Sequence, residues 1–562
     1  MSLMTRALRD ANIMTVPNLT GELARTQQSK NGDAVSVFGF LTPAQRNDVA
    51  GRTRSYDLTA AVNAAIAALG AAGGGTLLFP FGDYRFDGTL SVLKSNVTLQ
   101  GAGRGGTTFA FTSATADSIY WNGATAPGIY DCGIYDVAIV NTATRTAGIA
   151  LRLALTNQMT VERVTIDAAW QAFDIYVTNN VLLRSVIGTN IKGTQALKWW
   201  APADGSARSD VLTLTDSVFN LQNNGGNGIV LDGLVNTLRT FGCGVLDANY
   251  GLLVQNTGGS TSNFPGFVYC WDLEIDGTNS TAVRLEAGQQ FEFIGSDFFN
   301  LSTASGPIMT VLADASGSDT GSIRMSGCRL GGGKQQALAF NGRDLVMTGC
   351  NIGGGSGTTF NCIDLQSSAQ DVVIVGNKIG TWWGSPINKY VYGVGIANGV
   401  FRSHISDNSF YGCNGEVQDN STSGTSYVGP YLNRAGTPNW PNTIMKRSDN
   451  NTGVFDDKIY NTTAGAGVVA QRSFATGTTN SYVIDALKDN NGAPYMQRSA
   501  GSAVTTFYAD CNVHNFRTAA GVSQFAIGQL LPNYTSDSAA AAGGIVVGGF
   551  YRNGNAVQQR IA

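Results

Sequence analysis

The chain has 562 residues, 71 glycines, a net charge of −3 and only 13% charged residues. This length exceeds one ordinary hydrophobic core, and the near-neutral charge without a basic run argues against nucleic acid and anionic membrane surfaces as partners. Because no apolar stretch approaches the ~20 residues of a membrane-spanning helix, and because the chain holds two histidines and eight cysteines, we expect no membrane insertion, no metal site, no cofactor and buried free thiols.

The N-terminal part of the chain carries two signals. Residues 1–50 are mixed and polar, and their start, MSLMTRALRD, lacks the apolar region of a signal peptide, so we expect an attachment peptide. The following segment, SYDLTAAVNAAIAALGAAGGG, predicts one amphipathic helix with Ser55 or Asp57 as its N-cap and a glycine stop after Ala72. A helix at this place would close the open end of a solenoid.

An eight-residue pattern, apolar at positions 1, 3, 6 and 8, recurs twelve times between Val97 and Phe410. Clear copies are LTLTDSVF at 212–219 and IRMSGCRL at 323–330. The units start 22 to 35 residues apart, a spacing typical of solenoid rungs. The starts are Val97, Cys132, Met159, Val181, Leu212, Leu238, Val268, Phe291, Ile323, Leu345, Val372 and Ser403.

Each unit reads as two short strands around a tight turn, because the alternation of apolar residues slips at positions 4 and 5. Position 5 is mostly glycine or aspartate, which tolerate a left-handed backbone, and position 6 holds small or polar residues that we expect to stack inside the solenoid. A third strand follows in most units, as in FDIY at 173–176 and GIVL at 228–231. Three strands per unit predict an all-β protein with a parallel β-helix over 51–412.

The C-terminal part of the chain departs from this pattern. Residues 413–442 are rich in Asn, Ser, Gly and Pro and read as a linker. Short alternating segments in 443–562, such as SYVIDAL and TTFYADCNV, predict a β-sandwich for trimerisation or glycan binding.

The order of blocks in the N-terminal half resembles a known family. FGFLTPAQRNDVAG, DLTAAVNAAIAAL, GGGTLLFPFGDYRF and SNVTLQGAG follow one another as at the start of the right-handed, pectate-lyase-like β-helix of bacteriophage tailspikes and capsule depolymerases. The resemblance implies a homotrimer in the virion tail that binds and cleaves a bacterial surface polysaccharide. Since the long head-binding domain of large tailspikes is missing from this sequence, we expect docking onto other phage tail proteins.

Outward residues at like positions of successive rungs form columns, because neighbouring strands lie ~4.8 Å apart. One candidate column follows the third strand and mixes aromatic, amide and carboxylate groups, which suits an oligosaccharide groove. Asp232 and Glu286 lie two rungs apart in it, ~9.6 Å at the backbone, near the range of an inverting carboxylate pair. The column reads Arg152, Tyr176, Trp200, Asp232, Gln255 and Glu286.

A second candidate column runs through position 7 of the eight-residue unit. Adjacent Glu274 and Asp297 would lie ~5 Å apart, which fits a retaining pair, with Arg329 as the next residue along. Position 2 places Tyr269, Glu292 and Arg324 alongside. An acid next to an arginine is also how a sheet surface satisfies its charges, so both columns stay open.

Three functions remain open on this scaffold. The first is endo-glycoside hydrolysis by a carboxylate pair. The second is a polysaccharide lyase, for which Arg284, Arg324 and Arg329 would act around a uronate, and the third is a non-catalytic receptor-binding fibre. The outward apolar residues Val346, Val373, Val230 and Leu253 predict lengthwise packing of three chains.

Overall fold

The computed structural model describes residues 34–429 except 125–127, 203, 223–224, 258–264, 314–319, 355–358, 381–389 and 422–425, and after 430 it describes the backbone of most strands. The chain divides into two compact units. The first comprises Met1–Asp371, Asn377–Gly395 and Tyr411–Gln418, and the second comprises Val372–Gly376, Ile396–Phe410 and Asp419–Ala562.

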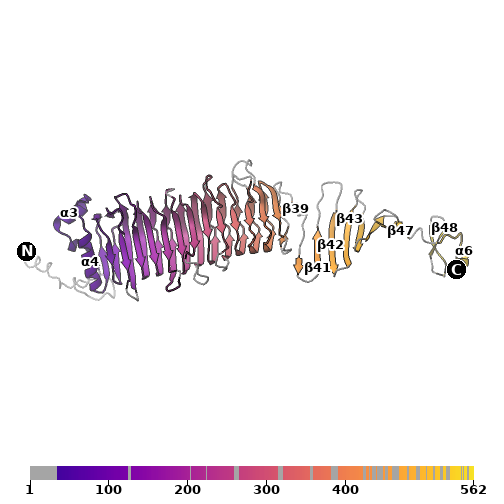
Figure 1. The fold of residues 1–562 in the computed structure, drawn as a ribbon, viewed down its shortest axis with the longest axis horizontal. Coiled ribbons are helices and arrows are strands. Elements are labelled where there is room, and N and C mark those ends of the chain that lie inside the picture. The colour runs from indigo at the N-terminus through magenta and orange to yellow at the C-terminus, as the bar shows by residue number, and fades with distance from the viewer. Residues whose placement is uncertain are drawn as a thin grey trace, which may run out of the picture. The chain divides into compact units, whose positions relative to one another are not determined.

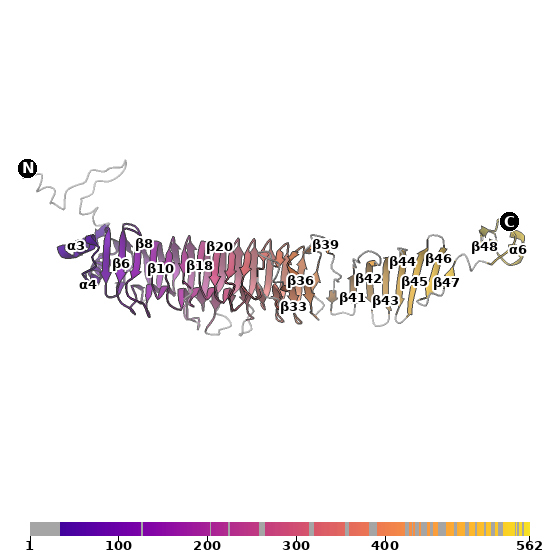
Figure 2. The same cartoon turned by 90° about the horizontal axis from the view of Figure 1, so that it is seen from above.

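Two helices lie at the N-terminal end of the first unit (Figure 2). The predicted helix is present as α4, Thr59–Ala71, but its N-cap residue is Leu58 rather than Ser55 or Asp57, and no side chain caps it. Asp57 instead holds the entry to the helix by accepting a hydrogen bond from the Thr59 amide at 2.9 Å. The apolar face of α4, which includes Val62 and Ile66, is buried beside the first strands, so α4 closes this end as expected (Figure 1).

A second helix, α3 (Pro43–Gly51), lies inside the segment that we expect to be an attachment peptide. It begins with a capping box, in which Thr42 and Gln45 satisfy each other's backbone amides, and the TPAQ sequence carries that signal. Asp48 of α3 is buried and accepts hydrogen bonds from the Ser55 amide at 2.8 Å and the Tyr56 amide at 3.3 Å. Burial alone would raise the pKa of Asp48, but the bonds from Thr53, Ser55 and Tyr56 outweigh it and leave the pKa lowered.

The rungs of the β-helix follow the predicted register. Val97 lies one residue before the paired Thr98 and Gly133, and Cys132, Met159, Val181, Leu212, Leu238, Val268, Phe291, Ile323 and Leu345 pair in succession. All of these pairings are parallel. A rung contributes either two short strands or one strand of 12 to 13 residues that runs through the turn to one long sheet, and one strand to a second sheet. Figure 1 shows the strands of successive rungs side by side.

The first sheet contains the eight-residue units. The strands of this sheet that lie in the first compact unit are β1 Ala34–Ser36, β2 Gly75–Leu78, β3 Gly82–Phe86, β5 Val97–Gln100, β6 Thr107–Phe111, β8 Ile129–Asn141, β10 Thr156–Asp167, β12 Asn179–Arg184, β13 Ile187–Thr189, β15 Ser209–Thr215, β16 Val218–Asn220, β18 Val235–Leu246, β20 Gly266–Thr278, β22 Gln289–Ile294, β23 Asp297–Asn300, β25 Gly321–Ser326, β26 Arg329–Gly332, β28 Arg343–Thr348, β29 Asn351–Ile352 and β32 Lys378–Gly380.

The second sheet contains the predicted third strands. It comprises β4 Leu90–Val92, β7 Ile119–Asn122, β9 Ile149–Ala154, β11 Gln171–Tyr176, β14 Gln195–Trp200, β17 Asn227–Asp232, β19 Tyr250–Gln255, β21 Thr281–Leu285, β24 Met309–Val311, β27 Leu338–Phe340, β30 Ile363–Leu365, β33 Tyr390–Ile396 and β36 Cys413–Asp419.

The turn at position 5 has the left-handed backbone that the sequence predicts. The φ angle is +58° at Asp136, +64° at Gly327 and +64° at Gly349. Arg163 and Ser185 adopt the same conformation at +51° and +52° without being glycine or aspartate, so the position dictates the backbone and the residue type only lowers its cost.

The interior is filled by positions 1, 3, 6 and 8. Apolar residues there, such as Leu212, Leu214 and Phe219, are fully buried, and each contributes about 1.5–3 kcal/mol of transfer free energy. The expected inward stack at position 6 is confirmed, since Ser217, Cys328 and the other members are buried. The seven described cysteines are free thiols, as predicted, and six of them are buried.

Two outward apolar residues differ from the expectation that they face water. Val230 is 1% exposed and Leu253 is 6% exposed in the single chain, so neither offers apolar surface for packing between chains. In the second sheet they follow Lys198 and precede Arg284 in the same outward column, and these long side chains account for the cover. The outward alternation predicts the direction of such side chains but not their burial.

The second unit begins within the rungs. Its strands include β31 Gln370–Val375, β34 Phe401–Ser406, β35 Ser409–Tyr411, β37 Tyr427–Val428, β38 Tyr431–Leu432 and β39 Pro438–Asn439. Because β37 pairs in parallel with β34, parallel pairing continues into 413–442, which the composition alone reads as a linker. The Ser, Asn and Gly content of that segment is typical of a linker, but its backbone still forms strand pairs.

The C-terminal strands pair antiparallel in sequence order. They are β40 Arg447–Asp449, β41 Gly453–Lys458, β42 Val468–Thr476, β43 Asn480–Lys488, β44 Pro494–Ala500, β45 Ala503–Asp510, β46 Val513–Thr518 and β47 Ser523–Ala526. They are followed by α6 Asp537–Ala542, β48 Phe550–Asn553 and β49 Ala556–Gln559. The described strands β40–β47 form one sheet, so the two-sheet packing of a sandwich stays a prediction. In the described part of the chain, no helix has the length and apolar character needed to cross a bilayer.

Candidate functional site

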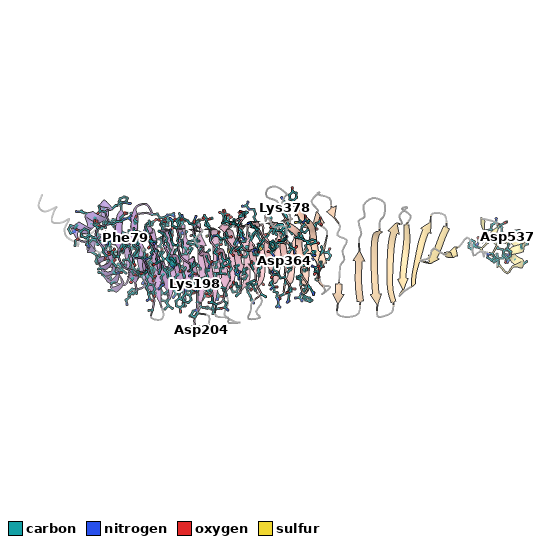
Figure 3. The ribbon with its side chains drawn as sticks, turned by 45° about the horizontal axis from the view of Figure 1, so that its top comes forward. Phe79, Lys198, Asp204, Asp364, Lys378 and Asp537 are labelled. Carbon is teal, nitrogen blue, oxygen red and sulfur yellow. The ribbon has the colours of Figure 1, made fainter. Side chains whose placement is uncertain are left out.

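A cavity of 420 Å³ opens at the ends of β20, β23, β26 and β29. Its charged lining consists of Glu274, Asp276, Asp297 and Arg329, and its apolar wall is Phe299. Three carboxylates against one guanidinium make the cavity acidic. Lys378 continues the Glu274 column in the first sheet, whereas Lys198 belongs to the second sheet, so the two candidate columns occupy different faces. Figure 3 labels Lys378 at the top of the β-helix and Lys198 lower down.

Glu274 and Asp276 leave the same face of β20, two residues apart. Strand rise separates them by ~6.6–6.8 Å at the backbone. Glu274 pairs with Asp297 and Ile275 with Phe298, and the next pair is Thr278 with Asn300. Asp276 and the following glycine therefore oppose a single residue, and such a bulge redirects the side chain next to it. Neither carboxylate forms a side-chain hydrogen bond or an ion pair with any described residue.

Asp297 is paired, in contrast to its two acidic neighbours. Arg329, its neighbour on β26, donates Nε to Asp297 Oδ1 at 2.6 Å and Nη2 to Asp297 Oδ2, a bidentate contact. The hydrogen bond that Arg329 donates to Asp297 raises the pKa of Arg329, and the negative charge of Glu274 adds to the effect. The guanidinium carbon also lies 5.8 Å from the centroid of the Phe299 ring. The predicted adjacency of Glu274 and Asp297 is confirmed, but Asp297 is engaged by arginine.

Four glycines, Gly331, Gly332, Gly353 and Gly354, also line the cavity. A Cβ on Gly332 would collide with the Asn300 carbonyl, and one on Gly353 would collide with the Gly380 carbonyl. Glycine is therefore required by the close approach of backbones, and the absence of side chains keeps the cavity open. The sequence signal was the GGG at 331–333 and the GGG at 353–355.

The position 2 residues lie outside this cavity. Arg324 forks onto Asp344 at 2.9 and 3.0 Å, which is the charge satisfaction expected of a sheet surface. Glu292 pairs with Arg324 in the strand register without lining the cavity. Tyr269 stacks at 5.9 Å on Trp271, an outward aromatic residue that the sequence analysis did not single out.

The column on the second sheet differs from the expected one at its start. Arg152 pairs with Asp174, which in turn pairs with Lys198, whereas Tyr176 pairs with Ala154 and Trp200. Arg152 therefore belongs to the neighbouring outward column, two residues away. The remaining members are in register, since Trp200 pairs with Asp232, which pairs with Gln255.

Tyr176 and Trp200 meet with their ring centroids 4.3 Å apart and tilted by 42°. The Trp200 indole N–H donates to Asp174 Oδ1 at 2.7 Å. Burial raises the pKa of Asp174 despite this bond and the nearby Arg152 and Lys198. Asp174 carries a perturbed carboxyl that the sequence analysis did not single out. Trp199 is fully buried and Trp200 is half-buried.

Asp232 is a structural anchor. It is 4% exposed, and its Oδ1 accepts the Thr257 amide and hydroxyl, both at 3.0 Å. Its Oδ2 accepts the Gln255 amide at 3.2 Å and lies 3.4 Å from Lys198 Nζ. Every lone pair is thereby engaged, so Asp232 offers no free oxygen to a substrate. This arrangement argues against the catalytic role expected for it.

Glu286 is occupied as well. Arg284 Nε donates to Glu286 Oε1 at 2.5 Å, and the same guanidinium lies 5.3 Å from the centroid of the Tyr250 ring. The Asp232–Glu286 pair expected for an inverting enzyme is therefore held by neighbouring donors on both sides. Of the two candidate columns, the one through Glu274 has carboxylates open to a cavity. Among the described residues, no group of three or more His, Cys, Asp or Glu side chains is arranged to hold a metal ion.

No family model matches the chain, and no curated protein matches its sequence. Solved structures do match. Tailspike protein 3 of bacteriophage CBA120 is 14% identical, with 93% of this chain and 76% of that chain covered and a TM-score of 0.51. The tailspike of E. coli bacteriophage HK620, solved with a pentasaccharide, is 10% identical over 84% of this chain and 95% of that chain, with a TM-score of 0.48. The A-module of mannuronan C-5 epimerase AlgE6 of Azotobacter vinelandii is 17% identical over 71% and 98%, also with a TM-score of 0.48. At this identity the likeness to the CBA120 protein establishes a shared fold, and that neighbour is one of the phage tailspikes that the sequence resembles.

Proposed function

We propose that this chain is a tailspike-type depolymerase that cleaves a bacterial surface polysaccharide by endo-glycoside hydrolysis. The observation that carries the proposal is the 420 Å³ cavity in which Glu274 and Asp276 stand unpaired over a floor of glycines. Hydrolysis of a glycosidic bond needs two carboxyl groups on either side of the bond. An open cavity on a long β-helix face admits an internal segment of a polymer.

The spacing of the two groups supports an inverting mechanism. Their backbone positions lie ~6.6–6.8 Å apart, and side chains that leave one strand face at this spacing can hold their carboxyl groups ~6.5 Å or more apart, which leaves room for a water molecule. We assign proton delivery to the glycosidic oxygen to Glu274, whose side chain is one methylene longer than that of Asp276. Asp276 then activates the water that attacks the anomeric carbon. Asp297, held by Arg329, orients the sugar through its remaining acceptor capacity.

The charge of the cavity favours a hydrolase over a lyase. A lyase must receive a uronate and neutralise its carboxylate, but the single guanidinium here is already engaged by Asp297. Two unpaired carboxylates would repel an acidic sugar. Arg284 and Arg324, the other arginines considered for elimination, pair with Glu286 and Asp344 away from the cavity. We therefore favour a substrate that is neutral at the cleaved bond.

The proposal extends to the assembly of the chain. A homotrimer in the virion tail that docks onto other tail proteins is supported by the resemblance to tailspikes. Val346, half-buried in one chain, remains a candidate for packing between chains after Val230 and Leu253 drop out. The partners are then the surface polysaccharide, other copies of the chain and other tail proteins.

The test uses the purified full chain on capsular polysaccharide and O-antigen. New reducing ends without absorbance from unsaturated uronates support hydrolysis. That absorbance would overturn hydrolysis in favour of a lyase, and polysaccharide binding without either product would overturn catalysis in favour of a receptor-binding fibre. Glu292→Gln serves as a matched control, because Glu292 lies one strand segment before Asp297 and outside the cavity.

A further inference from the structure

A second cavity, of 350 Å³, lies far from the acidic one. It opens where strands of the second sheet turn into the next rung, from β9 to β10 and from β11 to β12, and its lining includes Leu155, Val177 and Asn179. The acidic cavity lies instead where the eight-residue units end. Val181 and Val268 mark the two rungs, which are three rungs or about 14 Å apart along the axis.

A polar column forms one wall of this cavity. Asn157 pairs with Asn179, and Asn179 pairs with Asp210, so their outward side chains repeat at about the ~4.8 Å strand spacing. Neither the Asn157 nor the Asn179 side-chain amide forms a hydrogen bond with a described residue. As far as the described residues are concerned, each amide therefore offers a carbonyl acceptor and two N–H donors to a ligand.

The acidic member of the column is fully engaged. Arg208 Nε lies 2.8 Å from Asp210 Oδ2, and Asn236 Nδ2 donates to Asp210 Oδ1 at 3.1 Å. This carboxylate is paired on both oxygens, and no second carboxylate lines the cavity. The cavity thus lacks the pair of free acids that hydrolysis needs, while its two amides are free to bind.

The backbone around the cavity is unusual for the residues it contains. Leu155 and Val177 have φ angles of +54° and +48°, a left-handed conformation that a β-branched residue such as valine rarely adopts. The Leu155 amide donates to the Tyr176 carbonyl at 3.0 Å, and the Val177 amide donates to the Trp200 carbonyl at 3.2 Å. The same conformation recurs at other turns of the β-helix, as at Arg163, Ser185 and Val211, so this turn geometry belongs to the repeat. Here it shapes the cavity wall directly after the Tyr176–Trp200 ring pair.

We infer that this cavity is a second, non-catalytic glycan site that takes a neutral sugar bearing an acetamido group. An acetamido group carries one N–H donor and one carbonyl acceptor, which a free asparagine amide matches in both directions. Two amides one rung apart can engage successive positions of a chain. The inference is independent of whether the acidic cavity hydrolyses its substrate.

A second site on the same chain changes how the protein holds a polymer. Binding at one cavity makes binding at the other intramolecular, so the apparent affinity for long chains exceeds that of either site. Short oligosaccharides that reach only one cavity do not gain this increase in apparent affinity. The site would keep the protein on the polysaccharide between cleavage events.

The test measures binding of chitotetraose to the full chain by titration calorimetry. We expect the Asn157→Ala, Asn179→Ala double variant to bind at least tenfold more weakly, and maltotetraose, which lacks acetamido groups, to bind neither protein. Asn351→Ala, an outward amide on another face, and Glu274→Gln should bind chitotetraose like the wild type. Far-ultraviolet circular dichroism checks folding, and Asn179→Asp, at an exposed position, replaces the double variant if that one does not fold.

Two results would overturn the inference. One is an unaltered affinity in the double variant or in Asn179→Asp, or no chitotetraose binding by the wild type. The other is loss of chitotetraose binding on Glu274→Gln alone, which would put the sugar in the acidic cavity. The reducing-end assay fails or succeeds separately, so the second site and the proposed hydrolysis are tested apart.

Discussion

Replacing Asp232 with asparagine should destabilise the folded chain and leave catalysis in place. The substitution keeps the shape of the side chain and removes its charge. Asparagine can still accept from the Thr257 amide and hydroxyl through its one oxygen. Its NH₂ group, however, then faces the Gln255 amide nitrogen, 3.2 Å from the present oxygen, and Lys198 Nζ, 3.4 Å from it.

The expected loss follows from these two contacts. A hydrogen bond to a charged group contributes about 1.5–3 kcal/mol, and removing one member of a buried ion pair costs about 3–5 kcal/mol. The Lys198 side chain is 24% exposed and can turn to water, which lowers the second figure. We therefore expect Asp232→Asn to lose about 2–3 kcal/mol of unfolding free energy.

Asp276→Asn is the matched substitution in the acidic cavity. Because Asp276 is exposed and has no side-chain partner among the described residues, the unfolding free energy of the variant should differ from that of the wild type by less than about 0.5 kcal/mol. Its turnover should fall about 10²–10⁴-fold, the contribution of a positioned acid or base. Urea unfolding followed by tryptophan fluorescence gives stability, and reducing ends released per folded molecule give turnover.

An exchange of the effects of the two variants on stability and turnover would contradict these assignments. A stable Asp232→Asn protein without activity would return the site to the second sheet, as the carboxylate spacing alone first suggests. An Asp276→Asn protein with full turnover would remove it from the acidic cavity.

Three further predictions concern the scaffold. Gly327→Ala should lower the free energy of unfolding by about 1–2 kcal/mol, because φ is +64° at this residue and no atom crowds an added Cβ. Gly244→Ala, whose added Cβ would make ordinary contacts of 3.5 Å, should be near neutral. Equal urea midpoints for the two variants would contradict the role of the left-handed turn. The stabilisation from the Asp48 carboxylate should be complete above its ordinary pKa of 3.8 and be lost as the pH falls through its lowered pKa in the folded chain. Hydrogen exchange of the α3 amides should therefore rise in acid. Asp48→Asn should remove this pH dependence of exchange. Deletion of 443–562 should yield monomers or aggregates by native mass spectrometry, and a stable active monomer would instead assign this segment to glycan binding.

The rung repeat could be predicted from the sequence because a parallel β-helix stacks like on like. Apolar positions recur at the same place in each rung, so the register from Val97 to Leu345 follows from alignment of the chain with itself. The left-handed turn also follows, since glycine and aspartate mark it. The N-cap of α4 does not follow, because Leu58 occupies it without a side-chain bond and Asp57 acts one residue earlier.

The choice between the two columns could not be predicted, because it depends on which carboxylates already have partners. The sequence of the column does not show that Asp232 and Glu286 already have partners. Thr257, beyond the end of its strand, binds Asp232, and Arg284, in the neighbouring outward column, binds Glu286. Asp276 was missed for a related reason. It lies just beyond the eight-residue unit, at a bulge that changes the register locally. Its only signal was the EID sequence at 274–276, with two acids on one face of a strand.

The most direct test of the central claim is a crystal structure of the Asp276→Asn variant with an oligosaccharide from wild-type digestion of the polysaccharide. We expect a glycosidic oxygen within hydrogen-bond distance of the Glu274 carboxyl, with the sugar resting over Gly331 and Gly353. An oligosaccharide lying along Tyr176 and Trp200, with the acidic cavity empty, would contradict the account.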